Sequence, residues 1–356
     1  MKGAAGWVRD EIRALRAYHV VPASGLVKLD AMENPYALPP ELASGLGRHL
    51  AQVEVNRYPD PQAPSLKAIL RDSMAIPAGL DMVLGNGSDE ILQFIAVALA
   101  KPGAVMLALE PSFVMYRMSA VSAGMQYAGV SLAGDFSLDL PAVLEAIDRH
   151  RPALTWIAYP NNPTGNLFPR EAILAIVDAA PGLVVVDEAY YPFSGGATLM
   201  PEVGHHPNLV LVRTVSKLGL AGLRLGLAVG PGDWLAEFDK VRLPYNINVL
   251  TAAAAEFVLA HREVLQAQAE EIVAGRSLLE AALDLMPGVR RFPSAANFVL
   301  VRVVDAPRAF EGLKARGILV RNLHGTHPLL ANCLRLTVGT PDENARLLAA
   351  LAQANG

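Results

Sequence analysis

Between residues 80 and 230 the chain repeats one pattern: a short apolar run, a polar turn and a longer amphipathic stretch. Runs such as LVVVD and LVLVRT are apolar at nearly every position, so both faces of such strands must be covered. Strands of this kind, separated by helical segments, are typical of a mostly parallel sheet between helices. The pattern predicts a large, doubly wound α/β domain with strands at 81–85, 104–109, 126–131, 154–159, 183–187, 208–213 and 223–229.

The pattern changes after Pro244 and predicts a second, smaller α+β domain. Residues 248–286 indicate one long helix, followed by short strands near 297–303, 318–322 and 333–338 and a closing helix from about 341. Near the other end, residues 7–17 indicate a helix with an apolar stripe. We expect an N-terminal segment at 1–45 that packs with the small domain and with a partner subunit, a large domain at 46–250 and a small domain at 251–356.

The overall composition narrows the class of partner. The formal net charge of −4 predicts no general attraction to nucleic acid. The one cysteine, Cys333, excludes a disulfide within the chain, and its alternating apolar neighbours favour a buried core residue over a reactive thiol. The histidines lack the spacing of metal ligands, so no metal site is expected.

No segment predicts insertion into a membrane or export. The longest apolar run, residues 91–100, contains Gln93 and has about half the length that spans a bilayer. Charged residues between positions 9 and 16 interrupt the stretch where a secretory signal would be apolar. We therefore expect a cytoplasmic protein.

Polar residues follow several predicted strands at the point where each strand ends. In open α/β sheets, ligands bind beyond the carboxyl ends of the strands, so these residues are expected to converge. They are Gly85 to Ser88, Asn162, Asp187, and the pair Ser216 and Lys217.

The turn GNGSDE joins a predicted strand to an apolar helix. Glycines let a ligand approach the backbone, Ser88 can cap the helix, and the free N–H groups at a helix start favour a phosphate. A tight turn with a good cap explains the same residues equally well. A dinucleotide fingerprint would need glycine at position 90, where Glu90 stands, which weakens that interpretation.

Two further stretches suggest cofactor chemistry. Asp187 ends a buried strand, and a carboxylate there could keep a pyridine nitrogen protonated, with Tyr190 donating to a ring oxygen. A structural aspartate and a core tyrosine are the simpler explanation of that pair taken alone. Lys217 lies between apolar residues, so burial would lower its pKa and free its amine as a nucleophile, while Arg224 could grip a phosphate. An exposed lysine and a surface arginine are the alternative.

The combination of these stretches resembles one family. GNGSDE, YPNNPTG, VVVDEAYYPF and SKLGLAGLRLG occur in the order and at the strand ends found in the fold-type-I pyridoxal-phosphate aminotransferases. The resemblance implies that Lys217 carries the cofactor as an imine and later moves a proton, and that Asp187 holds the pyridine nitrogen protonated. It implies that Asn162 and Tyr190 bond the ring oxygen and that Phe113 stacks on the ring. The implied phosphate contacts are Gly87, Ser88, Asp89, Ser216 and Arg224.

Four more stretches resemble the histidinol-phosphate aminotransferase subfamily: LDAMENPYALPP, NRYPDP, RNL and LRLTVGTPDEN. The resemblance implies that Tyr36 closes the site over the substrate and that Tyr58 reaches the cofactor phosphate of a partner subunit in a homodimer. It places Arg335, and less specifically Arg321, against substrate anions. Alanine follows Tyr36 where the subfamily has glycine, and Phe113 replaces a tyrosine, so the detailed contacts at both places could differ.

This resemblance implies a ping-pong reaction that converts L-histidinol phosphate and 2-oxoglutarate to imidazole acetol phosphate and L-glutamate. Two enzymes on the same scaffold stay open as alternatives: an aromatic amino acid aminotransferase and a threonine-phosphate decarboxylase. A regulator that senses pyridoxal phosphate would carry a DNA-binding domain ahead of this fold, and the first 25 residues hold no helix-turn-helix pattern. The intact set of Lys217, Asp187 and Tyr190 favours an enzyme over such a regulator.

Overall fold

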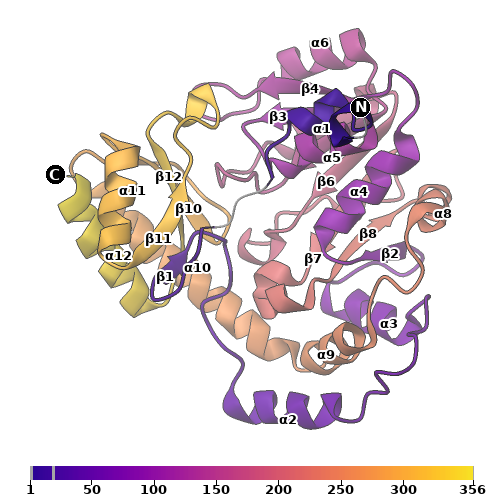
Figure 1. Ribbon diagram of the computed structural model, residues 1–356, viewed down its shortest axis with the longest axis horizontal. Coiled ribbons are helices and arrows are strands. Elements are labelled where there is room, and N and C mark those ends of the chain that lie inside the picture. The colour runs from indigo at the N-terminus through magenta and orange to yellow at the C-terminus, as the bar shows by residue number, and fades with distance from the viewer. Residues whose placement is uncertain (1–2, 18–20, 356) are drawn as a thin grey trace.

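The computed structural model describes residues 3–17 and 21–355 and contains two sheets linked by helices (Figure 1). Residues 1–2, 18–20 and 356, which belong to the predicted terminal segments, lie outside the described residues. None of the helices in the described part of the chain is long and apolar enough to cross a membrane.

The large sheet has seven strands in the order β2-β8-β7-β6-β5-β3-β4. β8 runs antiparallel to both neighbours, and every other pairing in this sheet is parallel. All seven predicted strands are present, and their ends differ from the predicted ones by three residues at most, so the expected mostly parallel sheet is confirmed. The strands are β2 (Asp81–Gly85), β3 (Val105–Glu110), β4 (Gln126–Ser131), β5 (Leu154–Ala158), β6 (Leu183–Asp187), β7 (Leu209–Thr214) and β8 (Gly226–Gly230).

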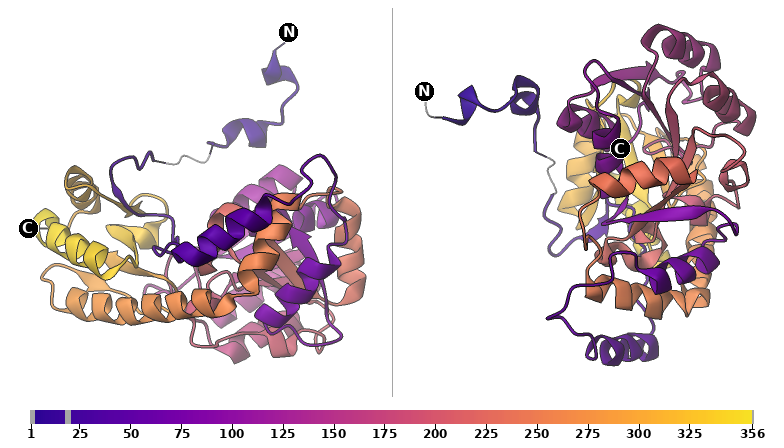
Figure 2. Two further views of the ribbon diagram at one scale, coloured as in Figure 1. Left: turned by 90° about the horizontal axis from the view of Figure 1, so that it is seen from below. Right: turned by 90° about the vertical axis from the view of Figure 1, so that its right-hand side faces the viewer.

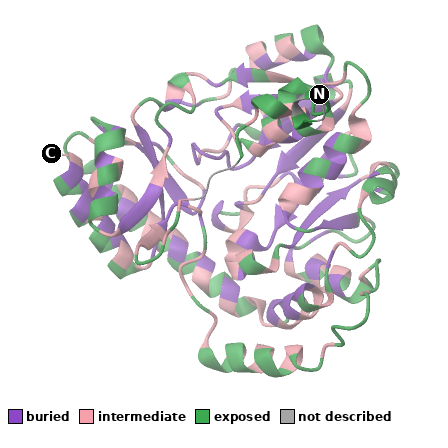
Figure 3. Ribbon diagram, in the orientation of Figure 1, coloured by how far each residue is buried: buried purple, intermediate pink, exposed green. Residues whose placement is uncertain are grey.

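Helices cover both faces of the large sheet, and Figure 3 shows the strands buried between them. Successive side chains of a strand point to opposite faces, so along β5 Trp156 enters one core and Ile157 the other. The Trp156 core includes residues of α4 (Ser88–Leu99), α5 (Met115–Ala123) and α8 (Gly232–Val241). The Ile157 core includes residues of α3 (Pro64–Ser73), α6 (Leu140–His150), α7 (Arg170–Ala179) and α9 (Val249–Leu259).

The small sheet has five strands in the order β1-β11-β12-β10-β9. β1 comes from the N-terminal segment and pairs in parallel with β11, so the two ends of the chain share one sheet. The residue limits predicted for the three segments remain a prediction. The elements are β1 (Val27–Leu29), β9 (Arg290–Arg291), β10 (Phe298–Arg302), β11 (Ile318–Asn322), β12 (Cys333–Thr337), α10 (Arg262–Asp284), α11 (Ala306–Ala315) and α12 (Pro341–Asn355). Cys333 is fully buried, as its pattern predicted.

The long helix predicted at 248–286 was wrong in one respect, because it is two helices, α9 and α10. The break falls at Ala260 and His261, where His261 leaves helical geometry with a φ of −117°. The His261 ring lies 2.9 Å from the carbonyl oxygen of Phe257 through Nδ1. The His261 side chain therefore contacts the carbonyl oxygen that would accept the next backbone N–H in a continuous helix, and the chain changes direction.

The helix predicted at 7–17 is present only in part, as α1 (Asp10–Ala14) after a short 3₁₀ turn. No residue of α1 is buried, and a short helix without a packed face gains little stability in water. Figure 2 shows this segment extending from one side of the molecule, and Arg9 donates to Val121 and Ser122 at the end of α5. α2 (Pro40–Leu50) also lies at the periphery and packs on α9.

Candidate active site

The carboxyl ends of β5, β6 and β7 open into one pocket, where the polar residues of the sequence motifs meet. Nine of the residues predicted to contact the cofactor line it: Ser88, Asp89, Phe113, Asn162, Asp187, Tyr190, Ser216, Lys217 and Arg224. The convergence follows from the parallel sheet, which brings the ends of its strands to the same edge.

Lys217 lies two residues after Val215, in a short π-helical turn that follows β7. Its Nζ donates to the carbonyl oxygen of Ala31 at 3.2 Å and lies 6.0 Å from the centre of the Tyr190 ring. Burial, followed by the positive charge of Arg335, lowers the pKa of Lys217 from 10.5 to about 8. A substantial fraction of the amine is therefore neutral near pH 8, as a nucleophilic lysine requires.

Asp187 is the last residue of β6 and is 5% exposed. Its Oδ2 accepts a hydrogen bond from the Tyr116 hydroxyl at 3.0 Å, and its Oδ1 accepts one from the Ala189 N–H at 3.0 Å. Burial raises the pKa of Asp187 from 3.8 to about 6, and the two hydrogen bonds oppose that rise. A buried carboxylate that still faces a pocket is poised to bind a cationic ring nitrogen.

The glycine turn and Arg224 form a cradle at the start of α4. Gly87 has a φ of +80°, and a Cβ at that position would lie 2.7 Å from Arg224 Nη2. The backbone conformation therefore favours glycine at this position, and the guanidinium group packs closely against it. Arg224 Nη2 bonds to Asp89 Oδ2 at 2.9 Å, which holds the arginine at the helix start. Ser88 was wrongly predicted to cap α4, because it is the first helical residue and Gly87 occupies the cap position.

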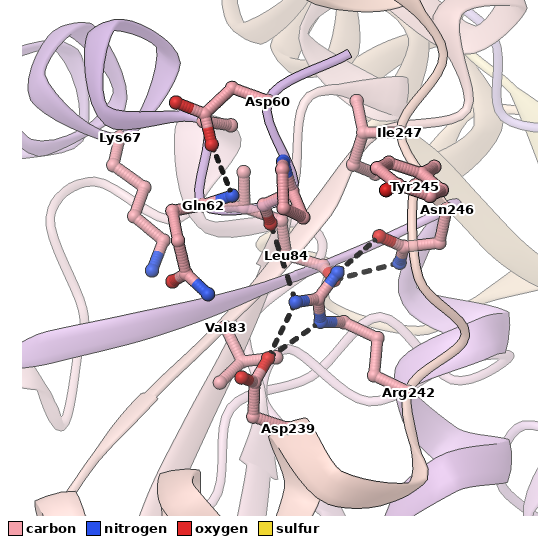
Figure 4. Close-up of a pocket in the computed structure, with 12 residues that line it drawn as sticks. Asp60, Gln62, Lys67, Val83, Leu84, Asp239, Arg242, Tyr245, Asn246 and Ile247 are labelled. Carbon is pink, nitrogen blue, oxygen red and sulfur yellow. Dashed lines mark hydrogen bonds and ion pairs between the residues drawn. The ribbon is translucent and has the colours of Figure 1, made fainter. Parts of the chain in front are cut away.

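A polar network behind the cradle fixes the glycine turn, and Figure 4 shows the part of it formed by Leu84, Arg242 and Asn246. Glu90 Oε2 accepts from the Asn86 N–H at 2.6 Å and from Asn246 Nδ2 at 2.6 Å. Asn246 also donates to the Leu84 carbonyl at 3.0 Å and accepts from Arg242 Nη1 at 2.8 Å. Glu90, which weakened the dinucleotide-fingerprint interpretation, thus has a role here in holding the turn.

Ser216 is anchored next to Lys217 by the residue that ends β7. Its N–H donates to Thr214 Oγ1 at 3.1 Å, and the two hydroxyl oxygens lie 2.8 Å apart. Thr214 Oγ1 is also 2.9 Å from the Leu225 carbonyl oxygen, one residue from Arg224. Thr214 therefore links Ser216 to Leu225, the residue that follows Arg224, and both Ser216 and Arg224 are predicted to bind the phosphate.

Asn162 and Arg335 meet at the side of the pocket that faces the small sheet. Arg335 is buried, and it donates to Asn162 Oδ1 at 2.6 Å and to the Asp30 carbonyl oxygen at 2.8 Å. Arg321 lies directly opposite Arg335 in the pairing of β11 with β12. Directly opposed residues of an antiparallel pair share one face, so both predicted anion contacts lie on the same side of the small sheet.

The aromatic residues of the pocket have different surroundings. Phe113 is half-buried, and its ring meets the Tyr116 ring edge-on with centres 5.7 Å apart. Tyr190 is buried and meets Phe298 of β10 edge-on at 5.2 Å, so it links the two sheets. These positions are compatible with stacking by Phe113 and hydrogen bonding by Tyr190, which remain predictions.

Tyr36 and Tyr58 do not line the pocket of their own chain. Tyr36 is partly buried against the core of the small sheet, and burial raises the pKa of its hydroxyl. Tyr58 is 82% exposed and stacks on Tyr245 with ring centres 4.7 Å apart. An exposed pair of aromatic rings is the arrangement expected of a residue that contacts another subunit.

The segment that follows β1 is part of the motif LDAMENPYALPP, but the role of its backbone was not predicted from the sequence. Three successive carbonyl groups of this segment accept bonds from side chains: Asp30 from Arg335 and Ala31 from Lys217, both predicted site residues, and Met32 from Asn297, which lies outside the predicted set. Backbone acceptors leave no trace in residue type, so no sequence signal could have identified them. Tyr116, in the first turn of α5, was also missed.

The pocket fits pyridoxal phosphate by the chemistry of its donors and acceptors. An amine of lowered pKa, a buried carboxylate, and a cradle formed by Gly87 and Arg224 lie along one surface. They match the aldehyde, the ring nitrogen and the phosphate of that molecule. Within residues 3–17 and 21–355, no cluster of three histidine, cysteine or carboxylate side chains could hold a metal ion.

Comparison with known proteins places the chain in a family. A family model described as aminotransferase class I and II matches residues 24–351. The chain belongs to the class I and II aminotransferases. The fold expected from its motifs is thereby confirmed, and so is the expectation of an enzyme.

Individual relatives narrow the position of this aminotransferase within the family. Histidinol-phosphate aminotransferase of Chromobacterium violaceum is 58% identical over 97% of this chain and 96% of the relative. Histidinol-phosphate aminotransferase 1 of Ralstonia nicotianae is 56% identical over 97% and 93%, respectively. The crystal structure of histidinol-phosphate aminotransferase from Sinorhizobium meliloti in complex with pyridoxal-5'-phosphate has a TM-score of 0.87 at 26% identity, covering 98% of this chain and 97% of that chain. The expected resemblance to this subfamily is confirmed.

Proposed function

We propose that this aminotransferase transfers the amino group of L-histidinol phosphate to 2-oxoglutarate, giving imidazole acetol phosphate and L-glutamate, with pyridoxal phosphate as cofactor. This reaction is a step of histidine biosynthesis. The observation that carries the proposal is the 58% identity with a histidinol-phosphate aminotransferase over nearly the full length of both chains.

The two arginines of the small sheet support an anionic substrate. Arg321 and Arg335 lie directly opposite each other, and like charges in that arrangement are normally destabilising. A bound anion offsets this repulsion, and a guanidinium group accepts a phosphate or a carboxylate in the same forked geometry. One pair of arginines can therefore serve the phosphate of one substrate and the carboxylates of the other.

The residues around Lys217 supply the proton transfers. When bound, pyridoxal phosphate supplies an electron sink for the carbon whose C–H bond breaks. Lys217 provides the amine that holds and then returns the proton, because its lowered pKa keeps part of it neutral. Asp187 holds a proton on the ring nitrogen by opposite charge, and Asn162 is oriented by Arg335 toward the ring oxygen. The cradle of Gly87, Ser88 and Arg224 keeps the phosphate in place.

A half-reaction tests the proposal directly. The purified yellow protein is mixed with L-histidinol phosphate without a keto acid, and the visible absorbance of the bound cofactor is followed. We expect rapid loss of the absorbance and its return on adding 2-oxoglutarate. A protein that never becomes coloured, even with added pyridoxal phosphate, would refute the assignment of Lys217.

The same half-reaction with other amino donors, together with an assay for carbon dioxide, separates the alternative enzymes. Loss of absorbance with phenylalanine or tyrosine, but not with L-histidinol phosphate, would identify an aromatic amino acid aminotransferase. Release of carbon dioxide from threonine phosphate would identify the decarboxylase. The two arginines do not exclude the decarboxylase, because its substrate also carries a phosphate.

We further propose that the enzyme is a homodimer in which Tyr58 contacts the cofactor phosphate of the partner subunit. Tyr58 and Tyr245 stack in an exposed position, and Leu243 and Leu250 are exposed nearby in the sequence. Exposed apolar side chains of this size favour a protein interface. Arg242 beside Tyr245 is held by Asp239 and Asn246, which gives this surface a fixed shape (Figure 4).

Subunit mixing tests the shared site. Two inactive variants, Lys217→Ala and Tyr58→Ala, are combined after partial denaturation and refolding. A mixed dimer carries one site with both residues intact, so we expect activity to return to about a quarter of the wild-type value if subunits pair at random. No return of activity, with a dimer demonstrated by sedimentation, would show that Tyr58 acts within its own chain.

We also propose that the dimer works in the cytoplasm, supported by the single buried cysteine.

A further inference from the structure

Tyr116 lies beneath the candidate site and contacts two of its predicted cofactor residues. It is fully buried on α5, its ring stacks on Trp156 with centres 5.2 Å apart, and its edge contacts Phe113. Its hydroxyl donates to Asp187 Oδ2 at 3.0 Å. The other carboxylate oxygen, Oδ1, accepts the Ala189 N–H, so each oxygen of Asp187 has one fixed donor.

We propose that Tyr116 is a positioning residue of the transamination reaction, which fixes the Asp187 carboxylate in the plane and in the ionised form needed to bind the ring nitrogen of the cofactor. The inference rests on the proposed function. Tyr116 is held by stacking and burial, so its hydroxyl cannot follow the carboxylate if the latter rotates. The carboxylate is therefore oriented by the protein before the cofactor arrives.

The surroundings of Asp187 explain why such a donor is needed. Burial favours the neutral carboxyl group, and the nearby negative charges of Asp89 and Glu188 act in the same direction. The hydrogen bond from Tyr116 is the largest influence that favours the ionised form. Loss of that one donor leaves a carboxylate that is easier to protonate and free to turn, and both effects weaken its contact with a ring nitrogen.

A purely structural role of the Tyr116 hydroxyl is the alternative, and the chain offers a matched control. Tyr127 of β4 is another largely buried tyrosine whose hydroxyl bonds to a carboxylate, that of Glu110. It lies outside the candidate pocket and packs under Arg117. Tyr116→Phe and Tyr127→Phe each remove one hydroxyl that bonds to a carboxylate, and because the Glu110 side chain is 24% exposed, the loss of stability is expected to be no larger for Tyr127→Phe.

The test compares these two variants as full-length enzyme. For Tyr116→Phe we expect the dissociation constant of pyridoxal phosphate, titrated into apoprotein, to rise about tenfold, since bonds to charged groups carry weight of that order. We expect kcat to fall by about the same factor while KM for L-histidinol phosphate stays within about twofold, because Tyr116 is fully buried and its hydroxyl bonds to Asp187. Tyr127→Phe should leave all three values within about twofold of the wild type.

A second measurement shows whether Tyr116 acts through Asp187. In an Asp187→Asn background, the Tyr116→Phe change should alter the dissociation constant of pyridoxal phosphate by less than about twofold, because the carboxylate is already absent. The inference is overturned if Tyr116→Phe, folded by its melting curve, matches Tyr127→Phe, or if its effect is undiminished without Asp187. A wild-type protein that binds no pyridoxal phosphate would refute the proposed function itself, which is a different result.

Discussion

Replacement of Asp187 by asparagine is expected to stabilise the apoprotein while it inactivates the enzyme. The carboxyl group of Asp187 is buried and has a pKa of about 6, against 3.8 for the group in water. Asparagine has the same shape and no charge. Its oxygen can accept from the Ala189 N–H, and its amide can donate to the Tyr116 hydroxyl, which then acts as an acceptor. The fold therefore tolerates the change.

The magnitude follows from the difference between the two pKa values. Between pH 3.8 and 6 the folded protein holds a proton at Asp187 that the unfolded chain has released, so stability falls as the pH rises. At about 1.4 kcal/mol for each pH unit, this cost reaches about 3 kcal/mol and stays constant above pH 6. Asp187→Asn removes that cost, so its advantage over the wild type grows from near zero at pH 4 to about 1–3 kcal/mol at pH 7.5.

Urea unfolding of both apoproteins between pH 4 and pH 8 measures this advantage. The same variant, loaded with pyridoxal phosphate, should turn over at roughly a hundredth of the wild-type rate or less, because the ring nitrogen loses its charged partner. Free energies of unfolding that differ by a constant amount across the whole pH range would refute the account of Asp187. So would an advantage that is largest at low pH.

Three other changes have distinct expected outcomes. Lys217→Ala should abolish turnover and the visible absorbance with pyridoxal phosphate, because the amine is lost, and unchanged steady-state activity would contradict this. Arg335→Lys keeps the charge but loses the forked guanidinium group that bonds to Asn162 through Nη1 and to Asp30 through Nη2. KM for both L-histidinol phosphate and glutamate should therefore rise about tenfold, and a change with only one substrate would argue against a shared anion site. Glu90→Ala should weaken binding of pyridoxal phosphate about fivefold, because it releases the turn at Asn86. Glu90→Gln keeps an acceptor oxygen and should restore this binding. Equal losses in the two variants would show that the charge of Glu90 matters instead.

Much of the architecture could be predicted because it depends on local patterns. A strand such as LVVVD is apolar on both faces wherever it occurs, so its burial between helices follows without knowledge of its neighbours. The same reasoning failed at His261, because Ala, Leu and Glu continue a helical pattern on both sides of the break. The helix breaks where the His261 ring contacts the carbonyl oxygen of Phe257. Helix propensity carries no information on such a contact.

The candidate site was predictable in its residues but not in their connections. The resemblance of four motifs identified Lys217, Asp187 and Arg224, and the topology brings them to one pocket. The hydrogen bond of Arg335 to Asn162 spans 173 positions along the chain, and that of Tyr116 to Asp187 spans 71. Side chains so far apart in the sequence meet only when both sheets are in place.

The amino-acid sequence alone determined the order of strands and helices and the residue types of the site, because hydrophobic period, turn residues and motif spacing are local properties. Only the tertiary structure decided which carbonyl groups hold Lys217 and Arg335, which tyrosine supports Asp187, and that Tyr58 does not line the pocket of its own chain. The physical reason is that desolvation and hydrogen bonding depend on three-dimensional neighbours, and these also set the pKa values on which the chemistry depends.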